Sequence, residues 1–151
     1  MPKVYIANLQ RIIRIPKELV AKAISTTLKS ENAADGTLSV AFVNDSNIRK
    51  LNKKFLKHDY ATDVIAFKLG DELLGEVVIS TQTAIREAKK RGISTKEEIL
   101  RYCIHGTLHI LGYNDKRPKD KTIMWAKQEK IIKRLKIADY LPRKIGADIF
   151  G

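Results

Sequence analysis

The chain has 151 residues, of which 44% are hydrophobic, and its 29 Lys and Arg against 17 Asp and Glu give a formal net charge of +12. This length suits one domain with a proper core, and no apolar run approaches the roughly 18–20 residues that cross a bilayer. The first residues lack the apolar region of a signal peptide, so we expect a cytoplasmic protein, and the basic excess favours contact with nucleic acid.

Hydrophobic periodicity predicts strands that alternate with helices. The predicted elements are, in chain order, a strand at 4–7, a helix at 16–29, a strand at 38–43, a short helix at about 45–55, strands at 64–67 and 76–80, and helices at 81–91, about 95–111 and about 119–136. Pro16 is suited to the first position of its helix, and Asp45 or Ser46 to the cap of the short helix, whose apolar positions include Phe55. The strands at 64–67 and 76–80 are expected to pair as an antiparallel hairpin with a long loop.

The helix that follows Ser94 is expected to occupy the centre of the core. Ser94 and Glu97 have the spacing of a capping box, which favours a helix start there. The apolar residues after them cover most of the helix surface: Ile99, Leu100, Cys103, Ile104, Leu108 and Leu111. We therefore predict a single α+β domain over residues 1–151, with a mixed sheet of about four strands, about five helices and this helix buried between them. Cys103, the one cysteine, is expected to be an inert buried thiol.

Two of the three histidines lie four residues apart near the end of that helix. At this spacing the Cβ atoms of His105 and His109 are about 5–6 Å apart on one helix face, so both rings can bind one metal ion. Gly112 allows the helix to end in a left-handed turn, after which Asp115 can return as a third ligand. Three protein ligands leave a fourth position for water, as in catalytic zinc sites. We expect Zn²⁺, and the harder carboxylate ligand leaves another divalent metal open.

The spacing is that of the metzincin-type zinc proteases, H-E-x-x-H-x-x-G-x-x-H, with two changes. Asp115 replaces the third histidine, and Gly106 replaces the glutamate that acts as general base in peptide hydrolysis. Because glycine has no group that takes a proton, the motif indicates a metal hydrolase that lacks the peptidase base. A zinc metalloprotease-like hydrolase is one alternative that the spacing leaves open.

The same stretch resembles the H-G-x-L-H-L-x-G-Y-D-H motif of the YbeY family of bacterial rRNA maturation endoribonucleases. Asn114 and Asp115 stand in place of the aspartate and the third histidine of that motif. The positions that match are Gly106, Leu108, Gly112 and Tyr113. Further segments match in the same order from about residue 40 to 135: Asp45-x-x-Ile48-x-x-Leu51-Asn52, Asp59-x-x-Thr62-Asp63-Val64, residues 75–80, and Met124, Gln128, Glu129, Ile131 and Ile132.

The resemblance implies a metal-dependent, single-strand-specific endoribonuclease that acts in ribosomal RNA processing, at the 3′ end of 16S rRNA, and in ribosome quality control. His105, His109 and Asp115 would be catalytic through the bound metal and its water. The implied partners are ribosomal RNA and the small ribosomal subunit, without a membrane, and we expect a monomer. Whether water or the RNA 2′-hydroxyl attacks, and at which bond, stays open.

Two departures from the family concern RNA contact. Leu56 stands where the family usually has an arginine, and Ala66 replaces a serine. The candidate RNA-binding residues crowd the same segment: Lys53, Lys54, Lys57 and His58. The alternative for each of these residues is a charged side chain that faces solvent on a short helix. Asp63 either orients the metal site as an outer acceptor or caps the end of a strand.

The C-terminal part of the chain is strongly basic and contains the only tryptophan. We expect Trp125 to serve core or helix packing rather than base stacking. The basic residues are Lys127, Lys130, Lys133, Arg134, Lys136, Arg143 and Lys144, the last two in a tail of about 137–151. They either line an RNA backbone or form a solvated face. A second alternative to the nuclease is a non-catalytic ribosome-associated RNA-binding factor, whose metal would hold the loop after Gly112.

Overall fold

The computed structural model describes residues 2–70 and 73–136. Along the chain the elements are β1 (Lys3–Asn8), α1 (Lys17–Ser30), β2 (Thr37–Val43), α2 (Asp45–Leu51), the π-helical turn η1 (Asn52–Leu56), β3 (Val64–Lys68), β4 (Gly75–Ser80), α3 (Thr81–Arg91), α4 (Thr95–Ile110) and α5 (Pro118–Leu135). Part of the predicted long loop between β3 and β4, and the basic tail with Arg143 and Lys144, lie outside the described residues. No helix among the described residues is long and apolar enough to span a membrane.

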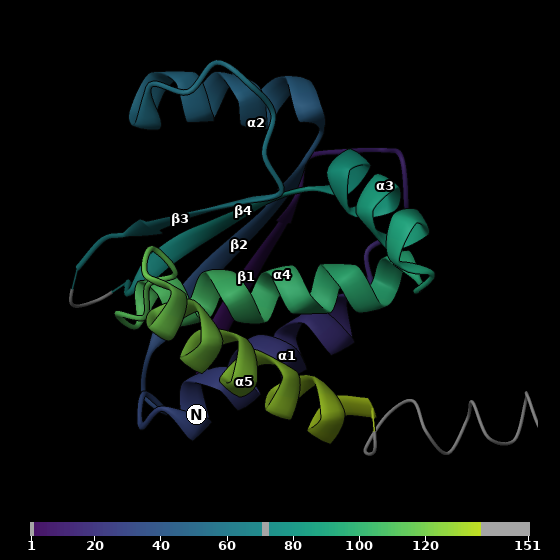
Figure 1. The fold of residues 1–151 in the computed structure, drawn as a ribbon. Helices are drawn as coiled ribbons and strands as arrows, with labels where there is room; N and C mark the ends of the chain where they lie inside the picture. The colour runs from purple at the N-terminus through teal and green to yellow at the C-terminus, as the bar shows by residue number, and fades with distance from the viewer. Residues whose placement is uncertain (1, 71–72, 137–151) are drawn as a thin grey trace, which may run out of the picture.

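The four strands form one mixed sheet in the order β1-β2-β4-β3. The pairs β1–β2 and β2–β4 are parallel, whereas β3 runs antiparallel to β4, as the predicted hairpin requires. Helices cover both faces of this sheet (Figure 1). The α+β fold class with a mixed four-stranded sheet is therefore confirmed.

The two faces of the sheet pack against different helices. On β4, Val77 and Ile79 belong to the large core on the α4 side, and Val78 between them belongs to a small cluster with Ile48 of α2. This alternation is the period of two that a strand imposes on its side chains. Helices α1 and α5 then pack on α4, and α1 also contacts β1, so α4 is enclosed by these helices and the sheet (Figure 1).

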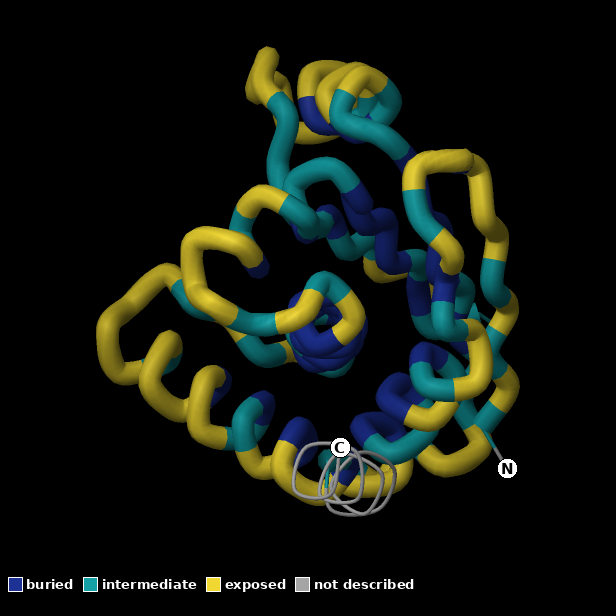
Figure 2. The backbone as a smooth tube through the Cα atoms, turned by 90° about the vertical axis from the view of Figure 1, so that its right-hand side faces the viewer, coloured by how far each residue is buried: buried dark blue, intermediate teal, exposed yellow. Residues whose placement is uncertain are grey.

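Helix α4 is the buried centre of the domain, as predicted. In Figure 2 it is seen end-on near the middle of the molecule and is largely dark blue, the colour of buried residues. Ser94 accepts a hydrogen bond from the Glu97 amide at 3.1 Å, but the Glu97 carboxylate pairs with Arg101 and Lys136, so the side chains do not complete the expected capping box. Cys103 is fully buried, and burial raises the pKa of its thiol, as expected of an inert cysteine.

Three local predictions need correction. Pro16 precedes α1 as its cap residue instead of occupying the first helical position. Helix α2 is capped by Asn44, whose side chain accepts from the Asn47 amide at 2.9 Å, and not by Asp45 or Ser46. Phe55 is 53% exposed, because it lies in η1, where the wider π-helical turn rotates it off the buried face of α2.

Candidate metal centre

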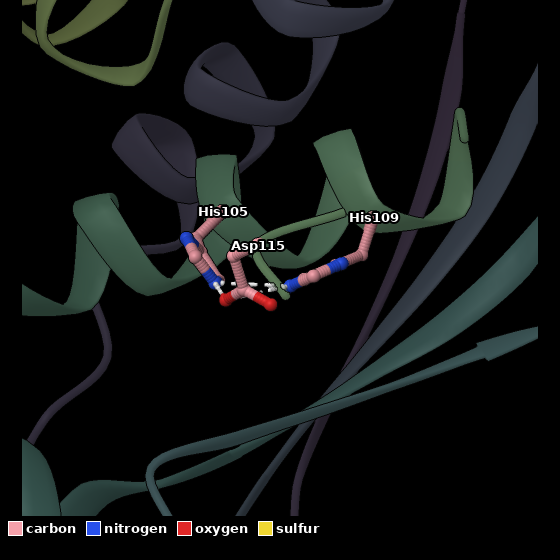
Figure 3. Close-up of side chains that lie close together, drawn as sticks. All are labelled: His105, His109 and Asp115. Carbon is pink, nitrogen blue, oxygen red and sulfur yellow. Dashed lines mark hydrogen bonds and ion pairs between the residues drawn. The ribbon is translucent and has the colours of Figure 1, made fainter. Parts of the chain in front are cut away.

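The end of α4 brings the predicted metal ligands together. His105 and His109 lie on its last two turns, and Gly112 follows with a φ of +105°, a conformation that L side chains rarely adopt. The amide of Tyr113 donates to the Leu108 carbonyl at 3.0 Å and closes the turn. The chain thereby doubles back, and Figure 3 shows the Asp115 carboxylate between the two imidazole rings.

The three side chains converge with the spacing of ligands around one ion. The Nε2 atoms of His105 and His109 are 3.1 Å apart, and each is 3.5 Å from Oδ2 of Asp115. A tetrahedron with metal–ligand bonds of about 2.0–2.1 Å has edges of about 3.3–3.4 Å. The residues present therefore fit a tetrahedral Zn²⁺-type ion, with the fourth corner open to a water molecule or substrate.

Each imidazole is oriented by a hydrogen bond at its other nitrogen. His105 Nδ1 donates to Oε1 of Gln128 on α5 at 2.9 Å, and His109 Nδ1 donates to the Tyr113 carbonyl at 3.0 Å. These bonds place the lone pair of each ring on Nε2, which faces the centre, as metal-binding histidines require. Sequence reasoning noted Gln128 only as part of a family match. The signal for its role was a polar residue within the apolar stripe of α5, where it is 3% exposed.

The electrostatics of the site favour a neutral imidazole. Burial, and next the neighbouring His109 ring, lower the pKa of His105 below its ordinary value, although Gln128, Asp115 and Asp63 act in the opposite direction. A lowered pKa keeps the ring unprotonated at neutral pH. The unprotonated ring is the form that binds a metal ion.

The loop that carries Asp115 is tied to two helices. The hydroxyl of Tyr113 donates to Glu31, which follows α1, and Lys127 of α5 pairs with the same carboxylate at 3.2 Å. The Lys127 ammonium also lies 5.4 Å from the centre of the Tyr113 ring. These contacts hold the backbone carbonyl that orients His109, so the ligand set is fixed from outside α4 as well as within it.

Gly106 lies where α4 packs closely against the sheet. A Cβ atom at this position would lie 2.6 Å and 3.0 Å from the two methyl groups of Val77 and 3.2 Å from a methyl group of Val64. The position where a metzincin carries its general base thus faces a packed valine. A glutamate there would have no space, so the packing of the candidate metal centre excludes the peptidase base.

The other residues singled out in the sequence lie apart from this centre. Lys53, Lys54, Lys57 and His58 are exposed on η1 and the turn after it, which lie on the opposite side of the sheet from α4 (Figure 1). Lys53 pairs loosely with Asp59 at 3.9 Å, and the His58 ring stacks on Tyr60 at 5.4 Å. Their contact with RNA stays a prediction.

Asp63 and Trp125 differ in how they meet the expectations. Oδ1 of Asp63 accepts from the Val64 amide at 2.7 Å, which fixes the start of β3, while the residue also lines a cavity next to His105. Trp125 is 49% exposed, so it does not pack in the core, but its ring lies 5.8 Å from the guanidinium of Arg91 on α3, which agrees with the alternative expectation of helix packing. Met124, its neighbour, takes the buried position on α5, and the next residue along a helix points about 100° away.

Comparison with known proteins shows which family this chain resembles. The family model described as Endoribonuclease YbeY matches residues 5–136. A protein named Endoribonuclease YbeY from Carboxydothermus hydrogenoformans is 37% identical over 137 residues, covering 86% of this chain and 95% of that protein. One of the same name from Desulforamulus reducens is 36% identical over 149 residues, covering 89% and 97%. The solution structure of a Thermotoga maritima protein superposes with a TM-score of 0.64 at 24% identity, over 90% of this chain and 89% of that one, and shows the same fold.

Proposed function

The chain belongs to the YbeY family, and from this premise we propose that it is an endoribonuclease that processes ribosomal RNA. The proposal extends to a metal-dependent cut in single-stranded RNA at the 3′ end of 16S rRNA, and to ribosome quality control in the cytoplasm. Ribosomal RNA and the small ribosomal subunit would be its partners. One observation carries the metal-dependent part: three ligand atoms converge at 3.1 to 3.5 Å from one another.

His105, His109 and Asp115 would hold the ion. When bound, a divalent ion would act as a Lewis acid toward a phosphate oxygen. It would also lower the pKa of a coordinated water toward neutral pH. We propose Zn²⁺, because two imidazoles and one carboxylate in a tetrahedral array are a common ligand set for zinc.

The chain's own residues orient the ligands and attract the substrate. Gln128 and the Tyr113 carbonyl hold the two imidazoles with Nε2 forward, and burial keeps His105 unprotonated. The net charge of +12 draws a polyanion to the surface. No carboxylate stands at position 106, so the chain provides no base at that position and the proton of the attacking group leaves through solvent or a substrate oxygen.

A peptidase is disfavoured by the same geometry. Its general base would have to occupy the space that Val77 fills beside Gly106. RNA cleavage does not require a base at this particular position, since the RNA phosphodiester offers its 2′-hydroxyl as an internal nucleophile, whose proton can pass to solvent or to a phosphate oxygen. The missing base at position 106 therefore distinguishes an RNA substrate from a peptide substrate more clearly than the spacing of the metal ligands does.

The deciding experiment compares the wild type with His109→Ala on a structured rRNA fragment, with excess chelator and with added Zn²⁺. Cleavage that requires both the metal and His109 supports the proposal. The matched control is Asp120→Ala, which removes a nearby carboxylate that pairs with Arg117 instead of facing the centre. Cleavage that persists in His109→Ala and in chelator would indicate a contaminating nuclease. Ribosome binding without any cleavage would favour the non-catalytic factor, and a 2′,3′-cyclic phosphate end would identify the 2′-hydroxyl as the nucleophile.

A further inference from the structure

A cavity of about 200 Å³ adjoins the metal centre and shares His105 with it. It extends from His105 toward the N-terminal part of α4, between that helix, α3 and α5. The lining residues that matter here are Asp63, Arg91, Glu98, Tyr102, Trp125 and Gln128. None of them is a metal ligand, so the cavity is a separate feature whose occupant would lie directly beside the centre.

Tyr102 lines this cavity and carries a buried hydroxyl. The residue is 7% exposed, and its hydroxyl oxygen has no hydrogen-bond partner among the residues that the structure describes. Leaving a buried hydroxyl unpaired is costly, and such groups are rare in native proteins. Burial, together with the charges of Glu98, Asp63 and Glu87 and the nearness of the Glu98 carboxylate to the hydroxyl, raises the pKa of Tyr102, so the hydroxyl stays protonated and able to donate.

Trp125 lines the same cavity with its ring half exposed. Its exposed fraction is 49%, and the guanidinium of Arg91 lies 5.8 Å from the ring centre. Exposed aromatic rings, with arginine beside them, are the surfaces on which proteins stack the bases of single-stranded nucleic acids. The ring thus offers a flat apolar surface, and Tyr102 adds a buried hydroxyl next to the cavity.

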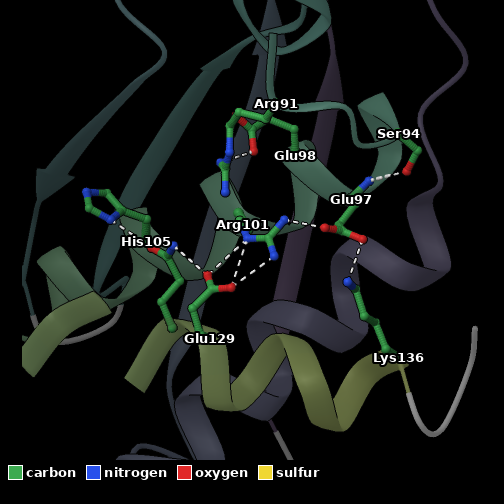
Figure 4. A network of polar contacts seen from close by, with 9 residues as sticks. Arg91, Ser94, Glu97, Glu98, Arg101, His105, Glu129 and Lys136 are labelled. Atoms are coloured by element: carbon green, nitrogen blue, oxygen red, sulfur yellow. Dashed lines mark hydrogen bonds and ion pairs between the residues drawn. The ribbon is translucent and has the colours of Figure 1, made fainter. Parts of the chain in front are cut away.

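The charges around the cavity favour a base over a phosphate. Arg91 pairs with the buried Glu98 at 2.7 Å, and Arg101 pairs with Glu97 and Glu129, as Figure 4 shows. Both arginines that line the cavity are therefore neutralised by carboxylates. Glu87 and Asp63 add two further carboxylates to the lining, which repel an anion and accept from the N–H groups of a neutral ring.

The size agrees with a single ring system. Pockets for drug-sized ligands hold about 300–1,000 Å³, and this cavity holds about 200 Å³. We propose that it binds one unpaired base of the RNA substrate, next to the phosphate at the metal centre, with the base stacked on Trp125 and its polar edge at Tyr102 and Glu98. This inference rests on the proposed function, because it deepens the description of that substrate.

Trp125 supplies its own reporter, since it is the only tryptophan in the chain. The full-length wild type, freed of metal, is titrated with a short unstructured oligoribonucleotide and, separately, with an abasic ribose-phosphate oligomer of the same length. Stacking on Trp125 should quench its fluorescence with the base-containing oligomer alone. Equal quenching by both oligomers, or none by either, overturns the proposal.

Variants test the same cavity during cleavage. Trp125→Ala should raise KM by roughly five- to a hundred-fold, the range expected for loss of one stacked base, and Trp125→Phe should restore most of it. Tyr102→Phe should raise KM without lowering the Tm, because the lost hydroxyl has no partner in the described protein. Ile123→Ala, which removes another exposed apolar side chain of α5 outside the cavity lining, is the control with unchanged kinetics.

The outcomes separate this inference from the proposed function. If the wild type cleaves RNA and Trp125→Ala cleaves it with the same KM, the cavity does not hold a base, although the nuclease stands. If base-dependent quenching is seen without any cleavage, the cavity proposal holds and the nuclease proposal fails. Quenching by unrelated peptides and not by the oligoribonucleotide would assign the surface to a protein partner and overturn the inference.

Discussion

Gly106→Ala tests whether α4 and the sheet leave no room for a side chain next to His105. The added methyl group would lie 2.6 Å from one methyl group of Val77 and 3.0 Å from the other. Overpacking of a core costs about 1–3 kcal/mol, and replacing glycine by alanine within a helix returns about 1 kcal/mol. The expected net loss is about 1 kcal/mol in the free energy of unfolding, or about 2–4 °C in Tm for a chain of this size.

Urea unfolding followed by far-UV circular dichroism measures this loss. Val77→Ala serves as the partner in a double-mutant cycle, because it removes the two nearest of the methyl groups that the new side chain would meet. The double variant should be more stable than the sum of the single changes predicts, by about 1–2 kcal/mol. A stabilised Gly106→Ala, or a cycle without coupling, would refute the claim that packing against β4 excludes a base from this position.

Three further predictions concern the centre and the charged cluster behind it. Loss of a hydrogen-bond partner of a metal ligand typically lowers metal affinity by about 10–100-fold, and Asp115→Ala should lower Zn²⁺ affinity by more than that, because it removes a ligand. Competition with a chromophoric chelator measures the affinity, and full zinc retention would show that Asp115 is not a ligand. Gln128→Leu leaves His105 without its acceptor and should weaken Zn²⁺ binding by about 10–100-fold, whereas an unchanged affinity would mean that the ring is held by packing alone. Burial would raise the pKa of Glu129, but hydrogen bonds from Arg101 outweigh it and hold that pKa below 4.5, so stability present above pH 4.5 is lost as the pH falls through the lowered value. Glu129→Gln should flatten this acid limb in pH-dependent thermal unfolding, and an acid limb as steep as that of the wild type would contradict it.

The metal ligands could be predicted from the sequence because their arrangement is local. A four-residue step on a helix places His105 and His109 on one face whatever surrounds it. Gly112 then decides the turn, since its φ of +105° suits a residue without a Cβ. The broad apolar surface of α4 likewise predicted its burial, because so wide a surface needs cover on several sides.

Local signals failed where a neighbouring turn changed the helix register or where two caps competed. The π-helical turn η1 rotates Phe55 into solvent, although the apolar spacing alone favoured its burial. Asn44 caps α2 because the carboxylate of Asp45 is taken by Ser80 and Thr83, at 2.6 Å and 2.8 Å. Neither outcome can be read from the segment alone, since each depends on which partner the fold brings near.

The sequence by itself determined the fold class, the candidate metal ligands and, through its resemblance, the family. Only the tertiary structure decided what surrounds His105 and His109. Gln128 reaches His105 across 23 positions, and Glu31 reaches Tyr113 across 82. The same packing seats Val77 against Gly106 and leaves Trp125 at the rim of a cavity. Helix spacing is set by short-range backbone geometry, whereas these contacts depend on how α1, α5 and the sheet dock around α4.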